Sequence, residues 1–246
     1  MRRPLAWVSV WLIVLIAWYV VAPHLVLAVE GRSLRLVIYA AALIFGALVA
    51  GTIRAVVPLS GWSRKTGWLL FSVAVVVAVA ATAGSLSIIS DVAKIAVGII
   101  GGMALGTTFE RPGWLAPSAL AVSLADLWSV LTPHGVTHVV IKKAPAVVPR
   151  LTIDVPIPGF DWGHGLLVGI VDVLFLAVYI TAAYRLALSV RAVMIAGACS
   201  LAVAIAVSVE LLDARAVPVL PVMSALVIVT TARPVFRDAL AMWRER

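Results

Sequence analysis

Charged residues and cysteine are scarce in this 246-residue sequence. Charged side chains form only 12% of it, whereas soluble domains carry about 25%. The one cysteine, Cys199, excludes an intrachain disulfide and a cysteine-based metal cluster. Because 63% of the residues are hydrophobic and the mean hydropathy is +1.14, we expect an integral membrane protein built from helices.

Acidic residues are fewer than basic ones, at 11 against 19, which gives a formal net charge of +8. In a soluble protein this excess would suggest binding to nucleic acid. Here the basic residues lie at the ends of apolar runs, where they contact the anionic headgroups of lipids. We therefore expect the lipid bilayer, and no nucleic acid, among the partners.

Long apolar runs dominate the chain. The first run follows Arg2 and Arg3 and has about 20 residues, whereas the apolar core of a signal peptide has about 7–15. We therefore predict that this run is a retained helix. The whole pattern predicts an all-α transmembrane bundle of eight helices, or nine if a boundary is missed. The eight runs lie at 5–28, 35–57, 66–89, 91–107, 113–132, 164–184, 190–210 and 216–232.

The distribution of Lys and Arg predicts the orientation in the membrane, because cytoplasmic segments carry an excess of both. With eight helices and an inner N-terminus, the inner segments hold twelve of the nineteen basic residues. The C-terminal segment RPVFRDALAMWRER is itself strongly basic. We expect an integral protein of a plasma membrane, of prokaryotic type, with a cytoplasmic C-terminus.

We predict two parts in the chain. Residues 1–112 hold N-terminal transmembrane helices that act as a scaffold, and residues 113–246 hold the C-terminal helices with the candidate site. The second part contains a long loop at 133–163. Within this loop, HVVIKK and RLTIDV are rich in β-branched residues and flank APAVVP. They predict either a β-hairpin with exposed edges or an irregular loop of polyproline character.

Asp126 and Asp172 are the two acids that lie well inside apolar runs; the other nine are assigned to loops, helix ends or the boundary at Ser90–Asp91. A carboxylate at membrane depth costs at least about 2.5 kcal/mol and usually faces a partner or a cavity. Arg54 and Lys94 lie near predicted helix ends. We therefore expect both cations to extend toward the headgroups, not to pair with these acids.

Helical periodicity of about 100° per residue places each acid on a face of small residues. Asp172 shares its face with Gly165 and Gly169, whose spacing lets another helix approach closely, and with Tyr179. The face of Asp126 carries small and polar side chains, namely Ala119, Ser123 and Ser129. The simplest arrangement has the two acids facing each other across a helix seam.

Two facing carboxylates in a site of low dielectric constant share a proton, because both do not ionise together easily. Such a pair can polarise a carbonyl with the protonated partner and activate water with the ionised one. It can also carry protons in a transporter, or form a structural hydrogen bond between helices. The residues themselves leave these three alternatives open.

Three motifs carry a resemblance to a known family: LADLW with Asp126, GIVD with Asp172, and PVLP at Pro218–Pro221. Successive motifs are 46 residues apart, from Asp126 to Asp172 and from Asp172 to Pro218. In order, spacing and helix placement they resemble the presenilin and signal peptide peptidase family of intramembrane aspartyl proteases. The resemblance covers residues 113–232 and implies a presenilin-like bundle.

The resemblance implies that Asp126 and Asp172 activate water against a peptide bond within or near a transmembrane helix. The substrates would be membrane proteins or signal peptides. Supporting residues would be Gly169 and the PVLP segment, whose prolines predict an interruption of the last helix. The supporting set is Gly169, Pro218, Val219, Leu220 and Pro221.

Three positions depart from the family motifs. Ala125 stands in place of Tyr, Val171 in place of the second Gly, and Val219 in place of Ala. The alternatives to a protease are therefore a proton-coupled transporter and an inactive presenilin-like protein with the same acid pair. We expect no metal and no cofactor, because PHGVTH has two histidines but the chain has no HExxH motif.

A transmembrane substrate helix must unwind before one of its peptide bonds can be cut. An exposed strand edge in HVVIKK or RLTIDV would hold the unwound segment by strand addition. Proline at Ile141 or Ile153 is then expected to lower cleavage.

Overall fold

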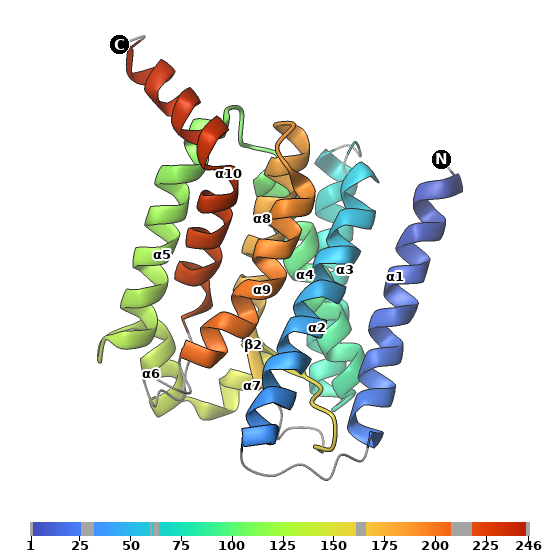
Figure 1. Cartoon of the computed structure of the whole chain (residues 1–246). Helices are drawn as coiled ribbons and strands as arrows, with labels where there is room; N and C mark the ends of the chain where they lie inside the picture. Colours follow the sequence, from blue (N-terminus) through green and yellow to red (C-terminus); the bar gives the residue numbers. More distant parts are fainter. Residues whose placement is uncertain are drawn as a thin grey trace.

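The computed structural model describes residues 2–25, 32–59, 61, 64–160, 166–207 and 218–244. The described chain is helical apart from one small sheet (Figure 1). The long helices are α1 (Arg2–Val21), α2 (Arg32–Val56), α3 (Arg64–Ala83), α4 (Ser87–Gly106), α5 (Leu115–Leu131), α8 (Ile170–Arg185), α9 (Val190–Val207) and α10 (Val219–Arg244). The shorter elements are α6 (Val136–Lys143), α7 (Val148–Leu151), β1 (Thr152–Val155), β2 (Leu166–Gly169) and four 3-10 turns, at Ala22–His24, Val57–Leu59, Pro112–Trp114 and Pro145–Val147.

Seven helical segments of the described chain are long and apolar enough to cross a membrane, where the sequence predicted eight. The eighth, α8, has 16 residues and is therefore about 24 Å long, shorter than the hydrocarbon core of about 30 Å. The chain is thus an all-α integral membrane protein. The start of α1 and the end of α10 lie at the same end of the bundle (Figure 1).

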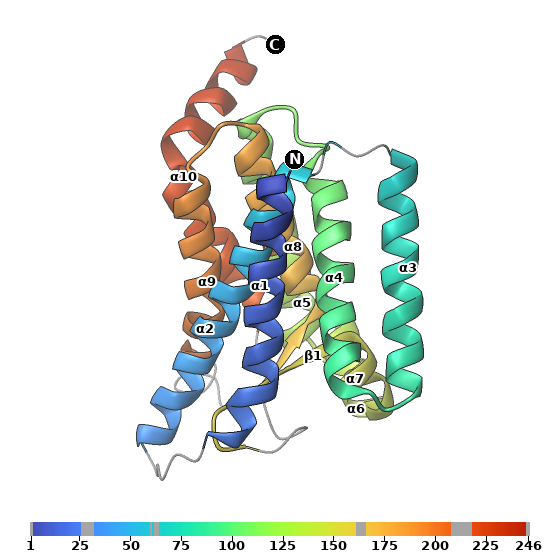
Figure 2. The ribbon, with the colours of Figure 1, turned by 90° about the vertical axis from the view of Figure 1, so that its right-hand side faces the viewer.

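Helix α8 occupies the centre of the bundle. It packs mainly against α4, and also against α2, α9 and α10, whereas α3 lies at the edge against α4 (Figure 2). Nine of its sixteen residues are buried. Outer helices expose apolar side chains instead, such as Ile13 on α1 and Val76 on α3, each 65% exposed, which suits contact with lipid.

Glycines on α4 allow the close approach of α8. A Cβ added to Gly98 would lie 2.9 Å from a side-chain carbon of Val173, and one added to Gly106 would lie 2.8 Å from the Val178 carbonyl oxygen. At Gly102 an added Cβ would meet the Leu174 carbonyl oxygen. Three glycines at intervals of four residues thus form a close-packing face on α4, whereas the sequence analysis predicted such a face on α8.

The sixth apolar run does not begin as a helix. Leu166–Gly169 forms β2, and the helix starts after Gly169, which is its N-terminal cap. Gly169 is therefore not part of the helix, and the small-residue face predicted for it on this helix is wrong. Gly165, the other member of the predicted face, lies outside the described residues. A continuous apolar run gives no periodicity by which to separate a buried strand from a helix.

The long loop also differs from its predicted hairpin. HVVIKK lies in α6, whereas β1 pairs antiparallel with β2, in the register Thr152↔Gly169 to Val155↔Leu166. The hairpin partner predicted for RLTIDV was therefore wrong, although TIDV is a strand. Gly135 as the N-terminal cap and the basic residues Lys142 and Lys143 in the last turn favour a short helix over the β-branched propensity of the segment.

Candidate functional site

Asp172 lies in the first turn of α8, directly after the sheet. The Gly169 backbone N–H donates a hydrogen bond of 3.0 Å to its Oδ2. This contact satisfies a donor at the helix N-terminus, where a carboxylate is also favoured by the helix dipole. The side chain is half-buried. The end of β2, the Gly169 cap and Asp172 are therefore joined at the start of α8.

Asp126 lies on α5, and its side chain is half-buried. Its Oδ2 accepts a hydrogen bond of 3.1 Å from the Leu220 backbone N–H. Leu220 is in the first turn of α10, where backbone N–H groups have no partner within the helix. The start of α10 thus holds this carboxylate in place.

The PVLP segment begins α10, and the predicted interruption of the last helix by this segment is wrong. Pro218 precedes the helix and Pro221 is in its first turn. Proline is tolerated there because its missing N–H would have no partner in the helix. Pro218, Val219 and Leu220 are buried. The proline inside the helix is Pro234.

Helices α5 and α8, which carry Asp126 and Asp172, both pack against α10. Each acid is held through one oxygen by a backbone N–H. The Leu220 contact therefore joins the LADLW and PVLP motifs, and the GIVD motif lies at the start of α8, which packs against the same helix, α10. Val171 and Ala125, the positions that differ beside the acids, are both exposed, Val171 by 53%, and Val171 leaves the Asp172 contact with Gly169 intact.

Tyr179 does not reach this site. Its hydroxyl lies 2.7 Å from the Ser224 hydroxyl oxygen in a buried contact that joins α8 to α10. On the other acidic helix, Ser123 bonds to its own helix at the Ala119 carbonyl, and Ser129 bonds to Thr137 of α6. These polar side chains therefore support helix packing, and the acids have no hydroxyl partner among them.

Lys94 and Asp91 form a buried ion pair that the sequence analysis missed. Their Nζ and Oδ1 atoms are 3.0 Å apart, and the residues are 5% and 4% exposed. Lys94 therefore does not extend to the headgroups, and the boundary at Ser90–Asp91 lies inside α4. The spacing of three residues between opposite charges was the available signal. Arg54 instead lies over the Tyr184 ring, 5.4 Å from its centre.

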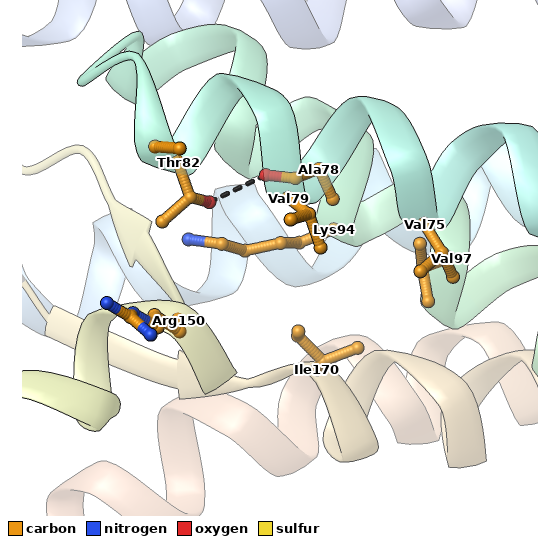
Figure 3. A pocket seen from close by; sticks show the side chains of 9 residues that line it. Val75, Ala78, Val79, Thr82, Lys94, Val97, Arg150 and Ile170 are labelled. Atoms are coloured by element: carbon orange, nitrogen blue, oxygen red, sulfur yellow. Dashed lines mark hydrogen bonds between the residues drawn. The ribbon is translucent and has the colours of Figure 1, made fainter.

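A cavity of about 420 Å³ lies between α3, α4 and the start of α8 (Figure 3). Its walls are mostly apolar, and the charged groups of Lys94 and Arg150 point toward the same side in this view. Ile170, two residues before Asp172, forms part of the wall. The lining residues are Val75, Ala78, Val79, Thr82, Ala83, Lys94, Val97, Arg150 and Ile170.

Within the described residues, no three His, Cys, Asp or Glu side chains gather as a metal ion would require. Comparison with known proteins adds no assignment: no protein family, no curated protein and no solved structure matches the chain.

Proposed function

We propose that this chain is an intramembrane aspartyl protease of the presenilin and signal peptide peptidase type. The observation that carries the proposal is that Asp126 and Asp172, on two helices that both pack against α10, are each held by one backbone N–H. Substrates are membrane proteins or signal peptides, cut within or near a transmembrane helix.

The mechanism follows from two carboxylates that share one proton. Gly169 and Leu220 each hold Oδ2 of one acid, which leaves Oδ1 of each to bind water or the substrate. The ionised acid takes a proton from water, and the resulting oxygen attacks the scissile carbonyl carbon. The protonated acid donates its hydrogen bond to the carbonyl oxygen, and a proton then passes to the leaving amine nitrogen as the C–N bond breaks.

The sheet supplies a place for an unwound substrate segment. Thr152 O and Asp154 N of β1 bond to Lys94 and Asp91, so by antiparallel alternation these two positions point away from β2. The outer edge of β1 is therefore occupied. Leu167, which pairs with Asp154, then points its backbone groups away from β1, next to the site.

The unwound substrate segment is therefore expected to add as a strand at this outer edge of β2. It is not expected at HVVIKK, because that segment is helical. Leu167→Pro removes an outward N–H without removing a bond to β1. We expect it to raise KM for a transmembrane peptide, whereas Leu167→Ala, which keeps the N–H, changes KM little. Equal KM values for both variants would exclude strand addition at this edge.

The function is tested with purified protein in liposomes that contain a reporter transmembrane peptide and a pH-sensitive dye. We expect peptide fragments from the wild type and none from Asp126→Ala or Asp172→Ala. Thermal unfolding curves are expected to show that all three proteins are folded. Proton flux that depends on both acids, without fragments, would identify a transporter instead. Absence of both activities from the wild type would support the inactive alternative.

A further inference from the structure

The Lys94 side chain makes three hydrogen bonds, which is all that an ammonium group can donate. Its Nζ lies 3.0 Å from Asp91 Oδ1, 2.8 Å from the Pro149 carbonyl oxygen and 2.9 Å from the Thr152 carbonyl oxygen. In Figure 3 its charged end points toward the strand and the short α7 helix. A cation of α4 thus holds the backbone at the start of β1.

Asp91 also binds the backbone of β1. Its Oδ2 accepts a hydrogen bond of 3.2 Å from the Asp154 backbone N–H. The ion pair therefore contacts β1 on both sides of Ile153, which is fully buried. One carbonyl and one N–H, two residues apart, meet one cation and one anion. This pattern of charges matches only one register of the strand, because a shift by one residue would turn both groups away.

The strand register leads directly to the candidate catalytic acid. Thr152, whose carbonyl Lys94 binds, is the register partner of Gly169. Gly169 in turn donates its N–H to Asp172. A displacement of β1 would thus carry β2 with it and change the position of the donor on the Asp172 carboxylate.

The free-energy cost of burying two charges indicates that the pair selects one alignment of α4 and β1 and is not needed for stability alone. Removal of two charges from water costs several kcal/mol per ion, and well-packed apolar residues often give equal or greater stability at such positions. Apolar residues, however, do not bind specific backbone groups of the strand and so do not distinguish one register from another. A buried pair that binds backbone groups of a different element selects one alignment of the two elements.

We propose that the Asp91–Lys94 pair is a positioning device that fixes the register of β1 and β2 and so orients Asp172 for cleavage. Neither residue touches the substrate. The catalytic part of this inference rests on the proposed proteolysis, whereas the structural part, the fixing of the sheet, stands without it.

The decisive variant removes both charges together. Lys94→Met alone leaves the Asp91 carboxylate buried without its counter-ion and so threatens folding. Asp91→Leu with Lys94→Met leaves no unpaired charge and keeps a similar volume. Lys94→Arg keeps a cation with several donors and serves as the rescue variant. Ser90→Ala is the matched control, because it removes a buried hydroxyl on the same turn that bonds to Thr82 and not to β1.

Two measurements are made on the full chain in lipid nanodiscs: amide hydrogen exchange, and cleavage of a transmembrane peptide. For the double variant we expect exchange at 152–155 and 166–169 to rise by about tenfold or more, with 173–183 unchanged. We expect kcat to fall by about 10-fold to 100-fold, because small misplacements of catalytic groups cost that much, while KM stays within about twofold. We expect Ser90→Ala to keep the wild-type exchange rates and kcat, and Lys94→Arg to keep most of the kcat that the double variant loses.

Unchanged exchange in the double variant would overturn the proposal, because the sheet would then hold its register without the pair. Faster exchange with an unchanged kcat would overturn the link to Asp172. A wild type that cuts no peptide would contradict the proposed function, and the exchange measurement would still decide whether the pair fixes the sheet.

Discussion

Leu220 donates its backbone N–H to Oδ2 of Asp126 at a distance of 3.1 Å, although the two residues are 94 positions apart. This contact joins the start of α10 to the middle of α5. It gives the PVLP segment a role that its prolines alone did not reveal: the helix begins here, so its first N–H groups are available to a carboxylate.

Leu220→Pro tests this contact, because it removes the N–H at a helix position where proline is tolerated. A hydrogen bond to a charged group contributes about 1.5–3 kcal/mol, so we expect kcat/KM for a transmembrane peptide to fall by about 10-fold to 100-fold. Leu220→Ala keeps the N–H and separates the effect of the side chain. If both variants lose the same activity, the N–H does not hold Asp126 for catalysis.

Gly169→Ala is expected to lower cleavage without lowering stability. The backbone at Gly169, with φ −67° and ψ 142°, suits any residue, but an added Cβ would lie 3.1 Å from Oδ2 of Asp172. The carboxylate must then move by a few tenths of an ångström, and we expect kcat to fall by about tenfold. Gly61→Ala is the control, since an added Cβ there meets no atom within 4 Å. Wild-type kcat in Gly169→Ala would show that the position tolerates a methyl group.

Much of the bundle follows from the sequence. Apolar runs located every long helix that the structure describes, and the scarcity of deep acids singled out Asp126 and Asp172, each of which accepts a hydrogen bond from a backbone N–H. Composition and run length suffice for this because the bilayer requires long apolar segments and penalises each charge inside them.

The elements around the acids were harder to predict. Leu166–Gly169 is apolar like the helix that follows, so its strand has no sequence signal of its own, and the β-branched HVVIKK is helical despite its propensity. Burial of Lys94 depends on partners 55 and 58 residues away, the Pro149 and Thr152 carbonyls. Such contacts arise from tertiary packing, which a reading of local pattern does not contain.

Gly102→Ala is expected to destabilise the bundle. The added methyl would meet the Leu174 carbonyl oxygen and lie 2.6 Å from Ala177 Cβ, so α4 and α8 must move apart. Overpacking of this kind costs about 1–3 kcal/mol, which we expect as a lower free energy of unfolding in detergent titrations. Gly84→Ala, with its nearest contact at 3.4 Å, serves as the control and changes this free energy little. Equal stability of the two variants would contradict the close approach of α4 and α8.

Tyr179→Phe separates a structural hydroxyl from a catalytic one. The Tyr179 hydroxyl contacts Ser224 at 2.7 Å, so its loss is expected to lower the free energy of unfolding by about 1 kcal/mol. Cleavage should stay within about twofold of wild type, because the contact lies away from the acids. Ser224→Ala removes the same bond and should give a similar loss of stability. A large loss of kcat in Tyr179→Phe would place the hydroxyl in the reaction.

The central claim is that Asp126 and Asp172 act as one catalytic unit. The most direct test compares the rate of product formation, with the cut bond identified by mass spectrometry, for the wild type, Asp126→Ala, Asp172→Ala and the double variant. Because the two acids share one reaction step, we predict that each single variant loses as much activity as the double variant. Losses that multiply in the double variant, or a single variant that still cuts at the wild-type bond and rate, would contradict the claim.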